Sequence, residues 1–101
     1  MIARIWRGAV RAEDVAAYAT YIQETGIEDY KRTPGNRGAW LMQRLEGGRA
    51  EIVTLSFWES RQAIERFAGQ DIEQAVFYPE DDRFLIERDL TVRHYEVADP
   101  A

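Results

Sequence analysis

The spacing of hydrophobic residues changes near the start of the chain, where a strand pattern gives way to a helix pattern. Residues 2–7 are apolar-rich and carry β-branched and aromatic side chains, as strands do. From Glu13 onward apolar residues recur at helical spacing, and Glu13 and Asp14 favour a helix N-terminus there. Gly26 can serve as its C-cap, and the loop at residues 32–38 is the latest point at which the helix ends. We therefore predict a strand at residues 2–7 and then a helix that begins near Glu13.

Two more strands follow a loop. The segment at residues 32–38 contains the Pro-Gly and Asn residues of a loop. The runs at residues 39–45 and 50–58 are rich in β-forming residues. Between them, Gly47 and Gly48 can adopt the positive φ angles of a tight turn. The two runs predict a β-hairpin.

A second helix is predicted immediately after the hairpin. Ser60 is the expected N-cap of a helix that begins at Arg61. Arg61 and Glu65 form an i,i+4 pair, and Gly69 is the expected stop. Its apolar face consists of Ile64, Phe67 and Ala68.

The last third of the chain predicts one short helical turn and one strand. Asp71 begins the turn, with Gln74 in the capping-box position, and Pro79 ends it. The final strand is predicted around residues 90–97. The tail at residues 98–101 is expected to fray.

The element order β-α-β-β-α-β is that of a ferredoxin-like α+β sandwich, in which both helices cover one face of an antiparallel sheet. We expect residues 1–101 to form this single domain. The uncovered face of such a sheet is normally polar at alternate positions. Here Ile52 and Trp58 share one side of their strand, while Val53, Leu55 and Phe57 share the other. Both faces are therefore expected to be buried.

The size of that second face indicates what buries it. Four strands about 4.8 Å apart and about six residues long present a face of roughly 400 Å². Stacking two such faces removes about 800 Å² from water, a gross gain on the order of 20 kcal/mol before the costs of association. A face-to-face homodimer is the simplest explanation. The alternative is a monomer whose loops or tail cover the sheet.

Composition and charge exclude several classes of function. The chain has no cysteine, which excludes disulfides, thiolate nucleophiles and iron–sulfur clusters. A single histidine argues against a transition-metal site built from protein side chains alone. The net charge of -5, without a basic run, argues against nucleic acid as a partner. Because we find neither a signal-peptide core nor a membrane-length apolar run, we expect no membrane contact and a cytoplasmic location.

A likeness to a known family is carried by five segments: MIARIWRG, TPGNRGAW, LSFWES, IERFAGQDIEQAVFYPEDDRFL and VRHYEV. In this order and spacing they resemble the stand-alone members of the antibiotic biosynthesis monooxygenase family, in the dimeric α/β-barrel superfamily. The resemblance implies a homodimer that forms such a barrel, with a cavity between the sheet and the helices of each subunit. It also implies a monooxygenase that uses no metal or flavin, since characterised members oxygenate anthrones, quinols and similar aromatic polyketides. The cofactor expectation is therefore none.

Another branch of that superfamily degrades haem with an Asn, a Trp and an iron-ligating His. This chain departs from that pattern. The strand at residues 2–7 has no Asn, Phe67 stands where those enzymes have Trp, and the segment IEQAVFY has no histidine. His94 lies on a different predicted element. Haem degradation by that mechanism is disfavoured.

His94 is the candidate catalytic residue. Its neighbours on the same side of the predicted strand are Leu90, Val92 and Glu96, a largely apolar stripe. There an imidazole could accept or donate a proton near neutral pH. The alternative is a structural histidine, hydrogen-bonded within the fold or across the dimer.

The candidate substrate-binding residues are large aromatic side chains. Each tryptophan shares a side of its predicted strand with polar residues, and such a mixture suits an aromatic ligand. The alternative is that they are core or dimer contacts. These candidates are Trp6, Trp40, Trp58, Phe67 and Tyr78.

The acidic residues Glu80, Asp81 and Asp82 are the remaining cluster of interest. They lack the ligand spacing and the turn glycine of a calcium loop, so no metal site is predicted. We expect solvated charges, or an ion pair from Asp82 to Arg83 or Arg88.

The function that fits these observations is a cofactor-independent monooxygenase acting on a small aromatic, quinol or polyketide-like substrate. Two alternatives stay open. The first is a non-catalytic homodimer that binds a small aromatic metabolite, and the second is a structural dimer without a cavity.

Overall fold

The computed structural model describes residues 1–98. The strands in this part of the chain are β1 (Ile2–Arg11), β2 (Asn36–Glu46), β3 (Arg49–Trp58), β4 (Leu85–Arg88) and β5 (Arg93–Glu96). The helical elements are η1 (Ala12–Asp14), α1 (Val15–Ile22), the π-helical η2 (Gln23–Ile27), α2 (Glu28–Arg32), α3 (Arg61–Ala68) and α4 (Asp81–Phe84).

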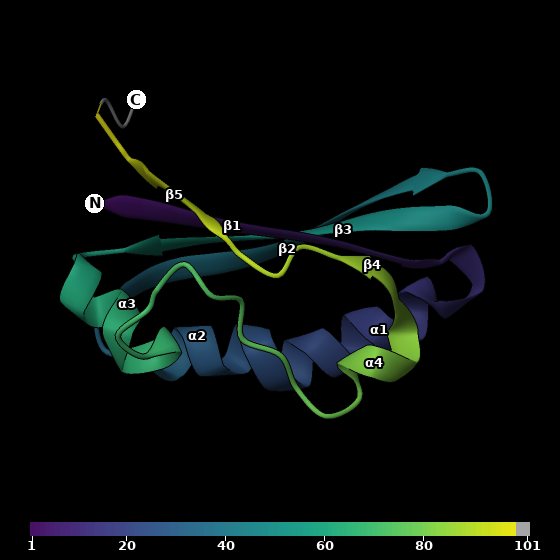
Figure 1. The fold of residues 1–101 in the computed structure, drawn as a ribbon, viewed down its shortest axis with the longest axis horizontal. Coiled ribbons are helices and arrows are strands. Elements are labelled where there is room, and N and C mark those ends of the chain that lie inside the picture. The colour runs from purple at the N-terminus through teal and green to yellow at the C-terminus, as the bar shows by residue number, and fades with distance from the viewer. Residues whose placement is uncertain (99–101) are drawn as a thin grey trace.

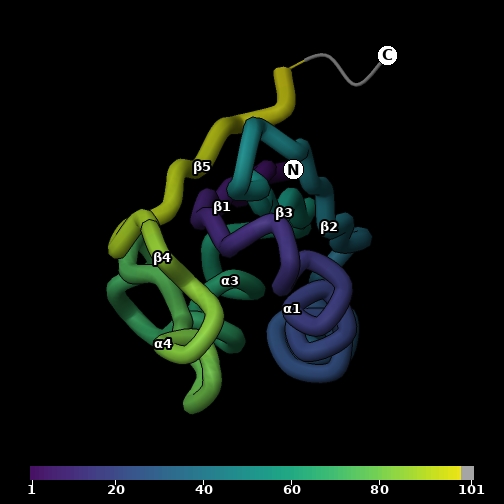
Figure 2. Tube along the Cα trace, turned by 90° about the vertical axis from the view of Figure 1, so that its right-hand side faces the viewer, coloured from purple at the N-terminus to yellow at the C-terminus, as the bar shows by residue number. Residues whose placement is uncertain are grey.

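All strand pairs are antiparallel, and the sheet has the order β2-β3-β1-β4, with β5 also paired to β1. The short strands β4 and β5 bind different stretches of β1 and so share one edge position of the sheet. The described helices lie together beneath one face of the sheet (Figure 1, Figure 2). This confirms the predicted ferredoxin-like α+β fold.

Strand β3 shows why two faces form, because its side chains alternate between the two sides. Every second residue from Ala50 to Trp58 is buried, while those between are half-buried. The β1–β3 register places Arg4 opposite Ser56 and Trp6 opposite Thr54. Since directly paired residues point to the same face, these four side chains lie together on the face that the helices cover.

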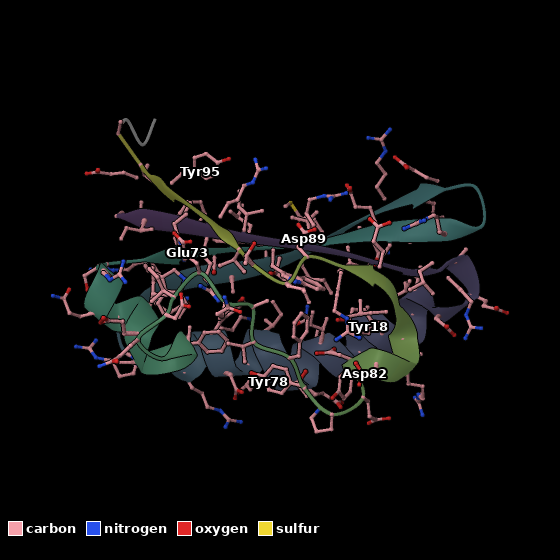
Figure 3. All side chains as sticks on the ribbon, in the orientation of Figure 1. Tyr18, Glu73, Tyr78, Asp82, Asp89 and Tyr95 are labelled. Atoms are coloured by element: carbon pink, nitrogen blue, oxygen red, sulfur yellow. The ribbon has the colours of Figure 1, made fainter. Side chains whose placement is uncertain are left out.

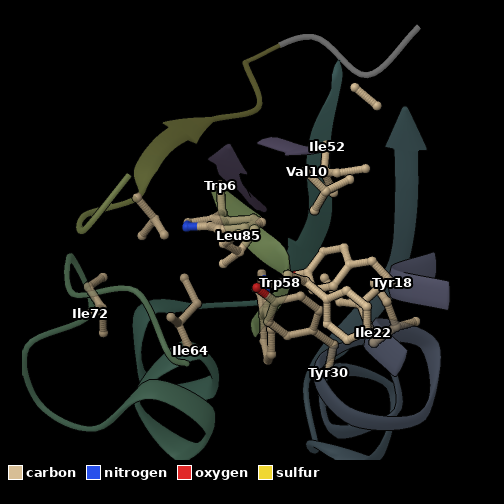
Figure 4. Close-up of a cluster of buried hydrophobic side chains, with 14 of the residues drawn as sticks. Trp6, Val10, Tyr18, Ile22, Tyr30, Ile52, Trp58, Ile64, Ile72 and Leu85 are labelled. Atoms are coloured by element: carbon tan, nitrogen blue, oxygen red, sulfur yellow. The ribbon is translucent and has the colours of Figure 1, made fainter. Parts of the chain in front are cut away.

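Trp6 occupies this inner face because Gly8, two residues further along β1, has no side chain. A Cβ on Gly8 would lie 2.5 Å from the Trp6 ring. The indole instead lies over Gly8 and donates from Nε1 to the Asp89 carbonyl at 2.8 Å. Figure 4 shows Trp6 in the apolar cluster with Trp58 and Tyr30, between the sheet and the helices.

Gly26 does not cap the helix, because the helical path continues to Arg32, where the predicted loop begins. Gly26 lies inside the π-helix η2 and is buried. The next buried residues, Ile27 and Tyr30, extend the apolar face of α1. Burial of that face outweighs the local glycine signal, and the π-helix adjusts the register between the two helices.

Of the helical turn predicted from Asp71 to Pro79, only one turn forms at its start, where the Gln74 amide donates to the Asp71 carbonyl at 3.2 Å. Gln74 makes an isolated bridge to Thr91 rather than a capping box. The Ala75 amide donates to Leu90 at 3.0 Å, and the Val92 amide donates to Glu73 at 2.8 Å. These bonds along residues 73–92 replace a helical hydrogen-bond ladder, so the segment at residues 70–79 is irregular.

The final strand is shorter than predicted, and another strand precedes it. The predicted strand at residues 90–97 is β5 at Arg93–Glu96, while β4 was not predicted. Residues 99–101 of the tail lie outside the described residues.

The predicted boundary signals of the hairpin and of α3 are confirmed, apart from Gly48. Ser60 caps α3 by accepting from the Ala63 amide at 3.2 Å. Gly69 ends it at φ 85°, and the pair of Arg61 with Glu65 is present. In the hairpin only Gly47 has a positive φ, at 63°.

The opposite face of the sheet carries apolar side chains that no described helix covers. Val53, Leu55 and Phe57 of β3 are half-buried there. Trp40 pairs with Leu55, and Met42 with Val53, and these two are 51% and 43% exposed. The expected burial of both faces therefore fails for a single copy of the chain. No helix in residues 1–98 is long and apolar enough to cross a membrane.

Candidate functional site

A cavity lies between the sheet and the helices, where the family resemblance implies one. Its volume is about 30 Å³, which holds one or two water molecules. The sheet, the helical path from α1 to α2, α3, α4 and the segment at residues 70–79 all contribute walls. The lining residues are Arg4, Trp6, Tyr18, Ile22, Gly26, Tyr30, Thr54, Phe67, Val76, Phe77, Tyr78, Asp81 and Val92.

Arg4 is the most unusual residue of the lining, because its charged side chain is only 1% exposed. Its Nη1 donates to the Ile72 carbonyl and lies 3.0 Å from His94 Nε2, and its Nη2 donates to the Gln74 carbonyl at 3.3 Å. The guanidinium also lies 5.8 Å from the centre of the Phe67 ring. A buried cation is thus held by neutral acceptors and an aromatic face.

Aromatic rings form the walls on both sides of the cavity. Trp6 on the sheet side packs edge-to-face with Phe77 of the irregular segment, with centroids 6.2 Å apart. Phe67 of α3 packs against Tyr30 of α2 at 4.5 Å. Such walls suit a flat, largely apolar ligand.

Asp81 supplies a buried carboxyl group to the same lining and is 4% exposed. It accepts from the Tyr18 hydroxyl at 3.1 Å and from the Tyr78 amide at 2.7 Å. Burial raises the pKa of Asp81 above its usual value, although both hydrogen bonds oppose that shift. A carboxyl group in this state can take up a proton closer to neutral pH.

Two tyrosines at the site, Tyr18 and Tyr78, keep their hydroxyl groups protonated. Burial, reinforced by Asp81, raises the pKa of Tyr18. Burial also raises the pKa of Tyr78, whose hydroxyl donates to Asp29. Both hydroxyls therefore act as hydrogen-bond donors rather than as bases, and Figure 3 shows both tyrosines on the helix side of the sheet.

His94 is half-buried on β5 and does not line the cavity. It pairs with Arg4 across the strands. Burial, together with the charges of Arg4 and Arg61, lowers the pKa of His94 to about 4. Because the guanidinium can only donate, the neutral imidazole accepts at Nε2 and carries its proton at Nδ1.

The predicted aromatic residues separate into two groups. Trp6, Phe67 and Tyr78 line the cavity, and Trp58 does not line it but packs behind Phe67 at 6.1 Å. Trp40 lies on the opposite face of the sheet and packs against Phe57. The side of a strand is visible in the sequence, but the pairing that places two strands on a common face is not.

Sequence reasoning missed Arg4 and Asp81 as site residues. The signal for Arg4 is a single charged residue on the side of its strand that otherwise carries Ile2 and Trp6. The acidic run offered no such signal for Asp81, because Glu80 and Asp82 on either side are also acidic and the sequence does not distinguish the buried one. Asp82 pairs with Arg88 at 2.6 Å, as predicted. Within residues 1–98 no three acidic or His residues gather as metal ligands would.

No family model matches the sequence, and no curated protein sequence matches it. Solved structures do match. A candidate antibiotic biosynthesis monooxygenase from Nitrosomonas europaea is 16% identical, with a TM-score of 0.67 over 98% of this chain and 100% of that one. One from Bacillus cereus is 17% identical, with a TM-score of 0.67 over 99% and 97% of the two chains.

A third match is the haem degrader MhuD of Mycobacterium tuberculosis, solved with two haems in its active site. It is 15% identical, with a TM-score of 0.64 over 100% of this chain and 99% of that one. At these identities the matches establish architecture alone. The chain has the fold of the antibiotic biosynthesis monooxygenase-like proteins, as its sequence predicts.

Proposed function

We propose that the chain is a monooxygenase that oxidises a small aromatic substrate, a quinol or polyketide-like ring, without a bound redox cofactor. The observation that carries this proposal is the cavity itself. Aromatic walls, a buried carboxyl group at Asp81 and a buried cation at Arg4 meet in one lining. These groups suit a reaction in which a ring gives up a proton and the resulting anion reacts with oxygen.

In this reaction Asp81 accepts the proton from the substrate, and the Tyr18 hydroxyl keeps the carboxyl group in place. The delocalised anion then passes electrons to molecular oxygen. For a methylene group oxidised to a carbonyl, the substrate gives up four electrons and two hydrogens. One oxygen atom becomes the carbonyl oxygen, and the other leaves as water with the two hydrogens. The walls formed by Trp6, Phe67 and Tyr78 hold the ring and exclude water.

The cavity, at about 30 Å³, is smaller than such a substrate, so one wall has to move to admit it. The wall at residues 70–79 lacks a helical or strand ladder. A surface hollow lined by Arg32, Arg66 and neighbouring residues shares Phe67, Val76 and Tyr78 with the cavity. Displacement of this irregular segment would join the hollow to the cavity.

His94 and Trp58 act on the substrate indirectly in this proposal. His94 fixes the orientation of Arg4 through the bond at Nε2. Trp58 supports Phe67 from behind. Trp40 belongs to the outer face, where we propose a role in association.

The residues present do not fit haem bound through iron. The only histidine is His94, whose Nε2 is already bonded to Arg4 and which lies outside the cavity lining. We therefore derive no step through haem.

The proposal is tested by measuring oxygen uptake by the purified chain with a panel of anthrones and quinols. We expect uptake in proportion to protein, with one oxygen molecule consumed per product. A Gly26→Leu variant should lower the rate at least about tenfold, since a side chain there extends toward Tyr78 and fills the cavity. Gly48→Leu, at a turn with no atom within 4 Å, is the matched control and should keep the parent rate. Binding of these rings without uptake under air would contradict the oxygenase and favour the non-catalytic binder.

We further propose that a second copy of the chain covers the outer face of the sheet. The face is apolar at its centre, with Leu55 and Phe57 flanked by the exposed Trp40 and Met42. Tyr95 extends from the same side (Figure 3). A standard homodimer has to bury a large area, so we expect the outer faces of the two copies to stack directly on each other.

A charge at the centre of that face should separate the copies. We expect Leu55→Glu to weaken association at least about 30-fold, because the interface would bury an unpaired carboxylate. Gln62→Glu adds the same charge on the exposed surface of α3 and should leave the dimer intact. Sedimentation velocity at micromolar concentration gives the answer. A parent chain that sediments as a single copy would refute the dimer.

A further inference from the structure

We propose that Arg4 is an anion receptor, and that the cavity selects aromatic rings carrying an ionised oxygen, a carboxylate or a phenolate, over neutral rings. This deepens the proposed function, on which it rests for the identity of the binding site. It concerns binding alone and does not require turnover.

The first argument is the missing counter-charge. Arg4 is 1% exposed, and no ion pair within residues 1–98 includes it. Unlike Arg4, the arginines that form ion pairs do so at the surface, where water screens the charges. Burial of a guanidinium without an anion costs several kcal/mol unless strong acceptors surround it. An anionic ligand in the cavity would remove that cost.

The second argument is an unused donor. Of the five N–H groups on a guanidinium, three reach the Ile72 carbonyl, His94 Nε2 and the Gln74 carbonyl. The buried Nε of Arg4 has no partner. Within residues 1–98 no other buried side-chain nitrogen or oxygen lacks a hydrogen-bond partner. An unpaired buried donor is unfavourable, and at a cavity it indicates where a ligand atom binds.

The third argument is geometric. Nε and Nη2 lie along one edge of a guanidinium, and this edge matches the two oxygens of a carboxylate or one phenolate oxygen. Nη2 of Arg4 has a single acceptor, the Gln74 carbonyl at 3.3 Å. A neutral ring would leave the Nε donor unpaired, whereas an oxyanion would satisfy it.

The surrounding charges agree with this assignment. The groups that face Arg4 from neighbouring elements are His94, which is neutral, and the carbonyls of Ile72 and Gln74. Phe67 covers the guanidinium. Asp81, the carboxyl group of the lining, can hold a proton when a second negative charge enters, because its burial favours the neutral form.

The test measures binding under anaerobic conditions by calorimetry, with benzoate and 4-nitrophenol as probes. Benzamide and 4-nitroanisole are the neutral counterparts. We expect each anion to bind about 10- to 100-fold more tightly than its neutral counterpart, the effect of one hydrogen bond to a charged group. Arg4→Met should abolish the preference, and Arg4→Lys should keep part of it. Arg11→Met, at the exposed end of the same strand and outside the cavity lining, is the matched control and should retain the full preference.

The parent chain alone provides a second readout, in case the Arg4 variants do not fold. Bound 4-nitrophenol should absorb as the anion at a pH where the free compound is mostly neutral. A preference for benzoate alone identifies a carboxylate as the ligand group, and one for nitrophenolate alone identifies a phenolate. Equal binding of anionic and neutral probes would overturn the proposal. Anion preference without oxygen uptake by any substrate would instead overturn the oxygenase and leave the receptor standing.

Discussion

Replacing Asp81 by Asn should lower the rate of oxygen uptake by about 10²- to 10⁴-fold, the usual contribution of a positioned general base. Asn keeps the volume of the side chain and one oxygen that accepts from the Tyr18 hydroxyl, but it loses the acceptor for the Tyr78 amide. It cannot accept a proton from the substrate. The expected loss lies in kcat, because the ring still fits between the same aromatic walls. Steady-state oxygen uptake with the best substrate of the panel measures it.

Asp82→Asn is the matched control for this variant. Asp82 is the adjacent carboxylate, but it is exposed and pairs with Arg88 at the surface, where such a pair contributes little. Its substitution should leave kcat within about twofold of the parent. Circular dichroism excludes unfolding as the cause of any loss.

The pH profile gives an independent check on Asp81. Its pKa is raised in the folded chain, so the ionised base is lost as pH falls through that raised value. The parent rate should rise with pH across this range and then level off, while any residual rate of Asp81→Asn should not follow that rise. A parent-like rate for Asp81→Asn would remove Asp81 from the mechanism.

The sequence was sufficient to predict the fold because its local signals and its apolar pattern agree. Ser60 and Gly69 bound α3, and Gly47 turns the hairpin, as their side chains dictate. The failures lie where tertiary contacts override a local signal. Gly26 does not end its helix because Ile27 and Tyr30 still have an apolar face to bury. The segment after Asp71 does not form a helix because its backbone bonds to residues 90–92.

The candidate site was less predictable, since it depends on which strands pair and in which register. Trp6 and Trp58 lie on the inner face while Trp40 lies on the outer one, although all three looked equivalent along their strands. The lone histidine drew attention because its ordinary pKa lies near neutral. In the fold its pKa falls to about 4, so it is neutral at pH 7 and serves Arg4 as an acceptor.

The same logic explains why Arg4 was overlooked. A charged residue in a strand is usually exposed, and only the β1–β3 pairing places Arg4 opposite the buried Ser56. The bonds to Ile72 and Gln74 come from a segment about seventy residues further along the chain. No local pattern can contain that information.

The largest expected change in stability follows from Trp58, the bulkiest of the fully buried side chains. Its ring packs edge-to-face against Tyr30 at 5.8 Å and beside Phe67, and its Nε1 donates to Ser56 Oγ at 2.9 Å. Trp58→Ala leaves a large void and an unpaired buried hydroxyl. We expect a loss of about 3–5 kcal/mol in the free energy of unfolding, measured by urea denaturation.

That loss is a large share of the roughly 5–15 kcal/mol that stabilises a typical domain, so the variant can fail to fold. Trp58→Phe retains a ring and should lose about 1–2 kcal/mol, mainly through the Ser56 hydroxyl. Trp40→Ala removes the same side chain from an exposed position on the outer face. In a Leu55→Glu background, where association is removed, it should cost less than about 1 kcal/mol. Equal losses for Trp58→Ala and Trp40→Ala would mean that the two faces of the sheet are not distinguished by burial, and the cavity would lose the wall that Trp58 supports.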